Sequence, residues 1–170
     1  MKNSMMKQLV VALVATFALS GAAFAEQAAD EAGIKKLVAD VEAAANKQDT
    51  GNARAKAVLA YATQDFTSSQ DGDAPNNRAD TEKAWTEGFG HGLKSATGKL
   101  TVRKIHSLQA DVALVDIDQE FSNVIGDDGK PQTQNAHVVA TVMKKNGKWL
   151  FSDIRQFYYS NAPAAASAAK

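Results

Sequence analysis

The side chains best suited to chemistry in this sequence are Asp153 and Arg155, near its C-terminal end. They stand two residues apart in an alternating segment, so both are predicted to project from the same face of a strand. The guanidinium of Arg155 could hold an anion through paired hydrogen bonds, and the carboxylate of Asp153 could orient it or act as a general base. A structural ion pair near the rim of a pocket is the alternative interpretation, because ion-pair networks also occur in clefts. Asp65 is a second candidate base.

Other catalytic and cofactor-binding patterns are missing from the sequence. His91, His106 and His137 do not recur at ligand spacing, and a zinc site needs three or four converging ligands, so no metal site is predicted. There is no glycine-rich phosphate loop, no Gly-x-Ser-x-Gly motif and no cysteine, so we expect no cofactor and no cysteine nucleophile. His137 is predicted to oppose Gln156, either as a polar contact or, beside Glu120, as a group that titrates near neutral pH.

An acidic stripe follows one predicted strand, where Asp116, Asp118 and Glu120 recur at every second position. Side chains at this spacing share one face of a strand. The stripe could attract a cationic partner or calcium, but we interpret it as a solvated face with Arg103 or Lys104 opposite it on the neighbouring strand.

The first 25 residues have the pattern of a secretory signal peptide. Two lysines precede an apolar run, Leu9–Leu19, and Ala23-Phe24-Ala25 resembles a cleavage site. We expect cleavage after Ala25, a periplasmic or secreted mature protein, and no membrane association after cleavage. Residues 26–160 suit a single domain, and the alanine-rich residues 161–170 are predicted to form a disordered tail.

The charge of the mature chain is nearly balanced, because removal of the leader leaves 17 basic and 19 acidic residues. This balance gives no electrostatic footprint for nucleic acid or an anionic membrane. The absence of cysteine excludes disulfide bonds, so stability must come from a hydrophobic core, which a chain of this size can bury.

Hydrophobic periodicity and turn residues predict three helices and five strands. Asp30 is a candidate N-cap of the first helix, and Asn77 with Asp80 resembles a capping arrangement for the third. The helices are expected over residues 31–47, 53–62 and 78–89, and the strands over residues 65–69, 99–108, 112–123, 133–145 and 148–159.

The Asn146-Gly147 turn sets a register for the last two strands, because Asn-Gly between apolar runs is a strong hairpin signal. Counting from this turn places Asp153 opposite Ala140, and Arg155 opposite Val138, on the face that carries the core residues. The opposite face carries an apolar patch, for which we expect a homodimer interface through the sheet. The residues of this patch are Val139, Met143, Leu150 and Ile154.

The order of these elements resembles the NTF2-like superfamily. Within it the chain is similar to the SnoaL-like relatives of ketosteroid isomerases, which include the domain of unknown function 4440. The matching features are a first helix from Ile34, Tyr61-Ala62-x-x-Asp65-Phe66, Asp111-Val112-Ala113-Leu114-Val115, and Asn146-Gly147-Lys148-Trp149-Leu150-Phe151. The resemblance implies an α+β cone: three N-terminal helices pack on a curved, mainly antiparallel sheet around a pocket. It commonly implies a dimer.

The catalytic residues of the steroid isomerases are not matched. Their base corresponds to a position at or near Ser69, and the first helix lacks the tyrosine that serves as oxyanion donor. The first hypothesis is therefore a domain that binds a small hydrophobic or anionic ligand. The alternatives are an isomerase, cyclase or hydratase-like enzyme acting on a carbonyl compound with Asp153 or Asp65 as base, and a non-catalytic assembly protein using its sheet face. The predicted ligand-binding residues are Tyr61, Trp85, Phe89, Val138, Asp153, Arg155 and Phe157.

Overall fold

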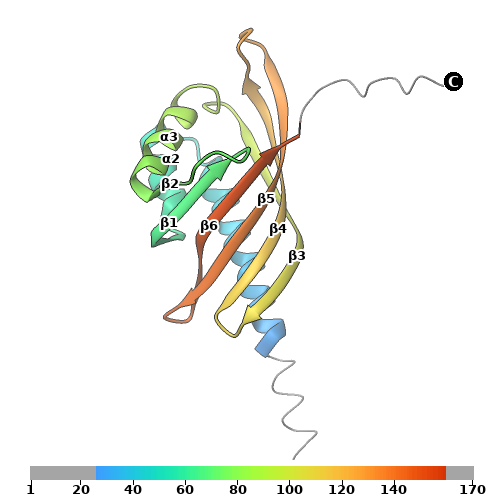
Figure 1. Cartoon of the computed structure of the whole chain (residues 1–170). Helices are drawn as coiled ribbons and strands as arrows, with labels where there is room; N and C mark the ends of the chain where they lie inside the picture. Colours follow the sequence, from blue (N-terminus) through green and yellow to red (C-terminus); the bar gives the residue numbers. More distant parts are fainter. Residues whose placement is uncertain (1–25, 160–170) are drawn as a thin grey trace, which may run out of the picture.

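The computed structural model describes residues 26–159, so the expected signal peptide and alanine-rich tail lie outside the described residues. The described chain is an α+β domain in which helices cover one face of a curved sheet (Figure 1). Its elements are a first helix at residues 26–46, α2 (Gly51–Leu59), β1 (Ala62–Gln70), β2 (Asn76–Asn77), α3 (Arg78–Gly90), β3 (Thr97–Gln109), β4 (Val112–Ile125), β5 (Pro131–Lys145) and β6 (Lys148–Tyr158).

The six strands form one sheet in the order β2-β1-β6-β5-β4-β3. β1 pairs with β6 in parallel, and the other neighbours pair antiparallel. The sequence predicted this mainly antiparallel sheet without the short β2. Only two of the three helices precede the sheet in the chain, because α3 lies between β2 and β3. No helix within residues 26–159 has the length and apolar character needed to cross a membrane.

Polar caps begin α2 and α3. The side chain of Thr50 accepts a hydrogen bond from the backbone of Ala53, and Asn77 accepts from the first turn of α3. Asn77 also donates to the carboxylate of Asp80 at 2.7 Å, which confirms the predicted capping pair. Each cap satisfies backbone donors that the helix itself leaves free.

Asp30 is not an N-cap, because the first helix already includes it. Its carboxylate instead accepts a hydrogen bond from Nζ of Lys144 at 2.6 Å and one from Nε1 of Trp149 at 3.3 Å. These bonds fasten the helix to the β5–β6 hairpin, a long-range role that local sequence cannot reveal.

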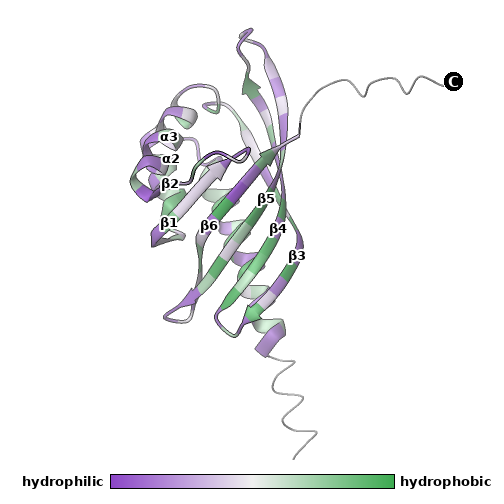
Figure 2. Ribbon diagram, viewed as in Figure 1, coloured by the Kyte–Doolittle hydropathy of each residue, from purple (hydrophilic) through white to green (hydrophobic). Residues whose placement is uncertain are grey.

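The core lies between the helices and the concave face of the sheet. Ile34, Leu37 and Val38 of the first helix pack against Val115 of β4 and Val138 of β5. Figure 2 shows hydrophobic residues concentrated along the central strands and hydrophilic residues at the tip of the β4–β5 hairpin.

The predicted register of β5 and β6 is correct near the turn and wrong beyond it. Lys145 opposes Lys148 and Val142 opposes Phe151 as expected, but the register shifts by one residue between Thr141 and Val142. Ser152 is the extra residue of this β-bulge. For every later residue of β6, this one extra residue reverses the face of the sheet toward which its side chain was expected to point. Beyond the bulge, the even-numbered residues of β6 face the helices, so the expected place of Ile154 in the outer apolar patch is wrong and its side chain lines the inner face.

Candidate functional site

The candidate site is a cavity of about 410 Å³ between the helices and the concave face of the sheet. Cavities of this size hold small organic molecules. Most of its wall is apolar. The apolar lining comes from the first helix (Val41, Ala45), α2 (Val58), β1 (Ala62, Phe66), α3 (Ala84, Trp85, Phe89), Leu93, β3 (Leu100), β4 (Ile117, Phe121), β5 (Val138) and β6 (Phe151, Ile154), with Ala74 beside β2.

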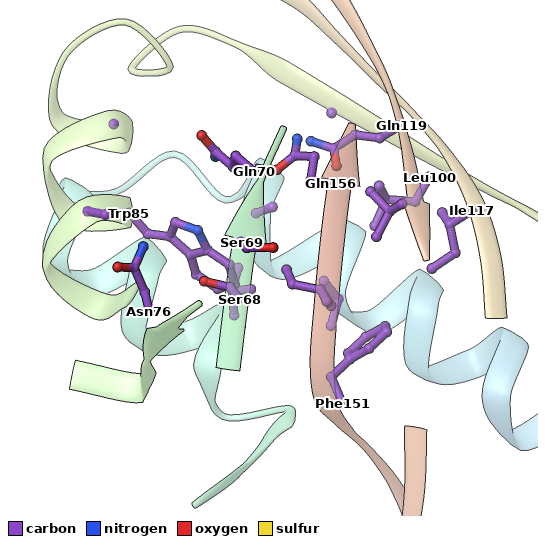
Figure 3. Close-up of a pocket in the computed structure, with 18 of the residues that line it drawn as sticks. Ser68, Ser69, Gln70, Asn76, Trp85, Leu100, Ile117, Gln119, Phe151 and Gln156 are labelled. Carbon is purple, nitrogen blue, oxygen red and sulfur yellow. Dashed lines mark hydrogen bonds between the residues drawn. The ribbon is translucent and has the colours of Figure 1, made fainter. Parts of the chain in front are cut away.

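Aromatic side chains from separate elements line the cavity. Phe66 of β1 and Trp85 of α3 meet edge to face, with ring centroids 6.0 Å apart. Such a pair is favourable beyond the area it buries, because the positive ring edge meets the negative ring face. In Figure 3 the indole of Trp85 lies across the cavity from Leu100 and Ile117, with Phe151 below.

The polar end of the cavity is built from side-chain amides and a phenol. Nε2 of Gln70 donates to Oε1 of Gln156 at 3.5 Å, and Gln119 of β4 turns its amide toward Gln156 (Figure 3). Tyr158 lines the same end. Burial raises the pKa of the Tyr158 phenol, and the negative charge of Asp71 adds to the effect. The phenol is therefore neutral at physiological pH and can donate a hydrogen bond.

Two carboxylates reach the cavity, and neither is placed as an obvious general base. Glu42 of the first helix accepts a hydrogen bond from the backbone N–H of Leu100, which ties the helix to β3. Asp73 is exposed in the connection between β1 and β2. Ser68, also in the lining, shares a buried 2.7 Å hydrogen bond with Thr81 of α3. The cavity is thus suited to holding an apolar molecule, with neutral hydrogen-bonding groups at one end.

Buried Arg54 fixes the wall that carries Phe89. It is 1% exposed, and its guanidinium donates to the backbone oxygens of Ala45, Leu93 and Lys94. The guanidinium also lies 4.4 Å from the centroid of the Phe89 ring. Burial lowers the pKa of Arg54. No pattern in the sequence marks Arg54, since its partners are backbone oxygens at the ends of two other segments.

The placement of Asp153 and Arg155 in the cavity is wrong. The bulge at Ser152 turns both onto the outer face of the sheet, away from the helices, where Arg155 opposes Val139 instead of Val138. Arg155 pairs with Asp153 at 2.8 Å and donates to Oγ of Ser69 at 3.1 Å. Asp153 also accepts a hydrogen bond from Thr67. This arrangement is the structural ion pair that the sequence left open as the alternative.

The other predicted site residues divide between the cavity and the surface. Trp85, Phe89 and Val138 line the cavity as expected. Tyr61 does not line it; it packs against the main core, and its backbone oxygen accepts from Phe151. Phe157 is 44% exposed, because the bulge turns it outward with Arg155.

Asp65 is also outside the cavity. It is exposed on β1, and a hydrogen bond from Thr63 lowers the pKa of its carboxyl. An exposed carboxylate with a lowered pKa is a weak base. Neither of the predicted bases, Asp65 and Asp153, lines the cavity.

Sequence reasoning missed Gln119 and Gln156 as site residues. Gln119 was detectable, since it follows Ile117 and precedes Phe121 at the spacing of the inward face of β4. Gln156 was not detectable, because its inward direction depends on the bulge.

The histidine and acidic-stripe predictions concern the outer face of the sheet. His137 opposes Phe157 and Asp118 rather than Gln156, and its Nε2 lies 3.4 Å from Asp116. Arg103 bonds Asp118 as predicted for the neighbouring strand. Among residues 26–159 no cluster of three or more histidine or acidic side chains could hold a metal ion.

Comparisons with known proteins identify the architecture. No protein-family model matches the sequence, and no curated protein matches it. Several solved structures match with low identity. An NTF2-like protein of unknown function from Shewanella oneidensis shares 16% identity, with a TM-score of 0.63, over 75% of this chain and 98% of that one.

Two further matches carry enzyme names. A putative scytalone dehydratase from Novosphingobium aromaticivorans shares 15% identity, with a TM-score of 0.67, over 79% of this chain and 87% of that one. A hexachlorocyclohexane dehydrochlorinase shares 13% identity, with a TM-score of 0.63, over 78% and 87%. At these identities the likeness concerns the fold, which hosts many functions. The chain therefore has the NTF2-like fold.

Proposed function

We propose that the mature, exported chain binds a small, largely apolar molecule in the cavity between α3 and the sheet. The observation that carries this proposal is the cavity itself: about 410 Å³ lined mainly by aliphatic and aromatic side chains, with amides at one end. A domain whose core buries Phe66 and Phe151 would ordinarily fill such a space with side chains. An open apolar cavity with a few convergent polar groups is the usual form of a ligand site.

A binding role fits the cavity better than proton-transfer catalysis. Isomerases and dehydratases need a general base within hydrogen-bond reach of the proton that they remove. Asp65 and Asp153 lie outside the cavity, and Glu42 is engaged by a backbone N–H of β3. The enzyme names of two structural relatives therefore do not transfer to this chain through any residue in its cavity.

The proposal can be tested with N-phenyl-1-naphthylamine, a neutral aromatic probe whose fluorescence rises in apolar surroundings. Titration into the mature protein should give saturable binding. Leu100→Trp should fill part of the cavity and displace roughly 60 Å² of apolar contact, about 1.5 kcal/mol. This loss corresponds to about a tenfold weaker affinity.

The matched control is Leu108→Trp, the same substitution on the same strand at a position that is 57% exposed and outside the cavity. It should bind the probe as the unmodified protein does. Thermal unfolding of both variants would check that the fold persists. Absence of saturable binding, or equal binding by folded Leu100→Trp, would contradict the proposal.

A further inference from the structure

The polar end of the cavity indicates what kind of molecule it accepts. We infer that the ligand is uncharged, with an apolar skeleton and one hydrogen-bonding head group such as a carbonyl, hydroxyl or amide, which Gln156 binds. This inference rests on the proposed binding function and adds the chemical class of the ligand and the residue that selects it.

Gln156 is a buried amide that the fold turns toward the cavity. It is 8% exposed, and the bulge at Ser152 sets its side chain on the concave face of the sheet. Its Oε1 accepts from Gln70 at 3.5 Å. Its amino group has two donor hydrogens: one is within hydrogen-bond reach of the Tyr158 phenol, and the other can bond a ligand oxygen. Gln119 turns its amide toward the same point (Figure 3). A ligand oxygen that accepts the second hydrogen would complete the hydrogen bonds of this buried amide, which is favourable.

The charges around the cavity oppose an anion. None of the residues that line the cavity is a lysine, arginine or histidine, whereas Glu42 and Asp73 are carboxylates. Arg155 is not available, because it pairs with Asp153 on the outer face of the sheet. A ligand carboxylate would lose its hydration without gaining a cation, and burial of an uncompensated charge is strongly unfavourable.

A ligand ammonium group would find no fully buried carboxylate in the lining. Glu42 is half-buried and one of its oxygens already accepts from the backbone N–H of Leu100, and Asp73 is exposed. The buried polar groups near Gln156 are neutral amides, hydroxyls and a phenol whose pKa is raised. The cavity thus offers neither a cation for a negatively charged head group nor a fully buried carboxylate for a positively charged one, and this favours a neutral head group.

The experiment uses four adamantane compounds of nearly equal shape that compete with N-phenyl-1-naphthylamine at pH 7.5. They are the methyl ketone, the carboxamide, the carboxylate and the aminomethyl compound, which is cationic. We expect the ketone and the carboxamide to compete at least about tenfold more strongly than either charged compound.

Gln156→Met tests the assigned residue, because methionine keeps a similar length and removes the amide. It should weaken competition by the ketone and the carboxamide about three- to tenfold, the range for one neutral hydrogen bond. Binding of the apolar reporter probe should change little. Gln109→Met, an exposed position at the end of β3, is the matched control and should change neither.

The outcomes separate this inference from the proposed function. If the reporter fails to bind, or binds equally to folded Leu100→Trp, the binding function itself is refuted. If the reporter binds in the cavity but the carboxylate or the ammonium competes as well as the ketone, the neutral-ligand inference is overturned. The same holds if no adamantane compound competes, or if Gln156→Met leaves competition by the ketone and the carboxamide unchanged.

Discussion

Arg54→Met should cost a large part of the stability of the domain, because this buried side chain holds the cavity wall that carries Phe89. The guanidinium of Arg54 makes four hydrogen bonds to three backbone oxygens and stacks on Phe89. Methionine keeps the apolar stem but leaves these oxygens without a donor. The oxygen of Ala45 accepts two of the bonds in a buried position, whereas the oxygens of Leu93 and Lys94 are partly buried and water can replace the lost donor there.

The magnitude follows from these contacts. A buried acceptor left without a partner costs about 1–3 kcal/mol, and loss of the cation–π contact with Phe89 adds about 0.5–2 kcal/mol. Relief from burying the charge of Arg54 offsets part of the loss. We expect a net loss of about 2–4 kcal/mol in the free energy of unfolding, against about 5–15 kcal/mol for a typical domain.

Urea unfolding followed by circular dichroism measures this loss. The midpoint should fall by about 1–2 M with an unchanged slope. The control is Arg103→Met, which breaks an ion pair on the exposed outer face of β3 and should cost no more than about 1 kcal/mol. A loss below about 1 kcal/mol for Arg54→Met would show that water reaches the oxygen of Ala45, which would refute the reasoning from burial.

Three further changes have defined outcomes. Gly51→Ala should lower the free energy of unfolding by about 1–3 kcal/mol, because a Cβ there would lie 2.3 Å from a backbone oxygen of α3. Gly90→Ala is the matched control: a Cβ there meets no atom within 4 Å, so chemical denaturation should show unchanged or increased stability. Tyr158→Phe should remove a step above pH 10 from the absorbance titration at about 295 nm. The raised phenol pKa contributes stability that is present below pH 10 and is lost as the pH rises further, so the variant should lose less stability than the unmodified protein above pH 10. We also propose a dimer through the outer sheet face, where Val139→Lys with Met143→Lys should give a monomer in light scattering; a monomeric unmodified protein at about 50 μM would count against it.

The fold could be predicted from the sequence because its signals are local and agree with one another. The Asn146-Gly147 turn, the cap at Asn77 and the alternation along β4 each act within a few residues. The cavity wall follows from the same patterns, as Trp85 and Phe89 share one face of α3. Local signals of this kind do not depend on contacts with distant parts of the chain.

The chemistry of the site could not be predicted in the same way, because it depends on one extra residue. Nothing in the sequence around Ser152 marks a bulge, yet the bulge decides whether Arg155 or Gln156 faces the cavity. A charged anion site and a neutral amide site therefore differ by one position of register. The role of Arg54 could not be predicted for a related reason. Its partners are backbone oxygens of distant segments, and these do not affect the residue types next to Arg54 in the sequence.

Deletion of Ser152 tests whether this residue is the whole cause of the difference. Without it, Phe151, Ile154 and Gln156 would keep their inward directions in a regular ladder, because Thr141 already opposes Asp153. The deletion should therefore fold, with a change below about 2 kcal/mol in the free energy of unfolding.

Deletion of Val139 is the matched control on the neighbouring strand, where the ladder is regular. It shifts one half of β5 by a residue and turns either Val138 or Ala140 out of the core. The result should be loss of cooperative unfolding in urea, since a slip of one residue exchanges every buried side chain beyond it. If deletion of Ser152 unfolds the domain as deletion of Val139 does, then the bulge supplies the curvature on which the sheet depends. The strand register alone would then not account for the folded sheet.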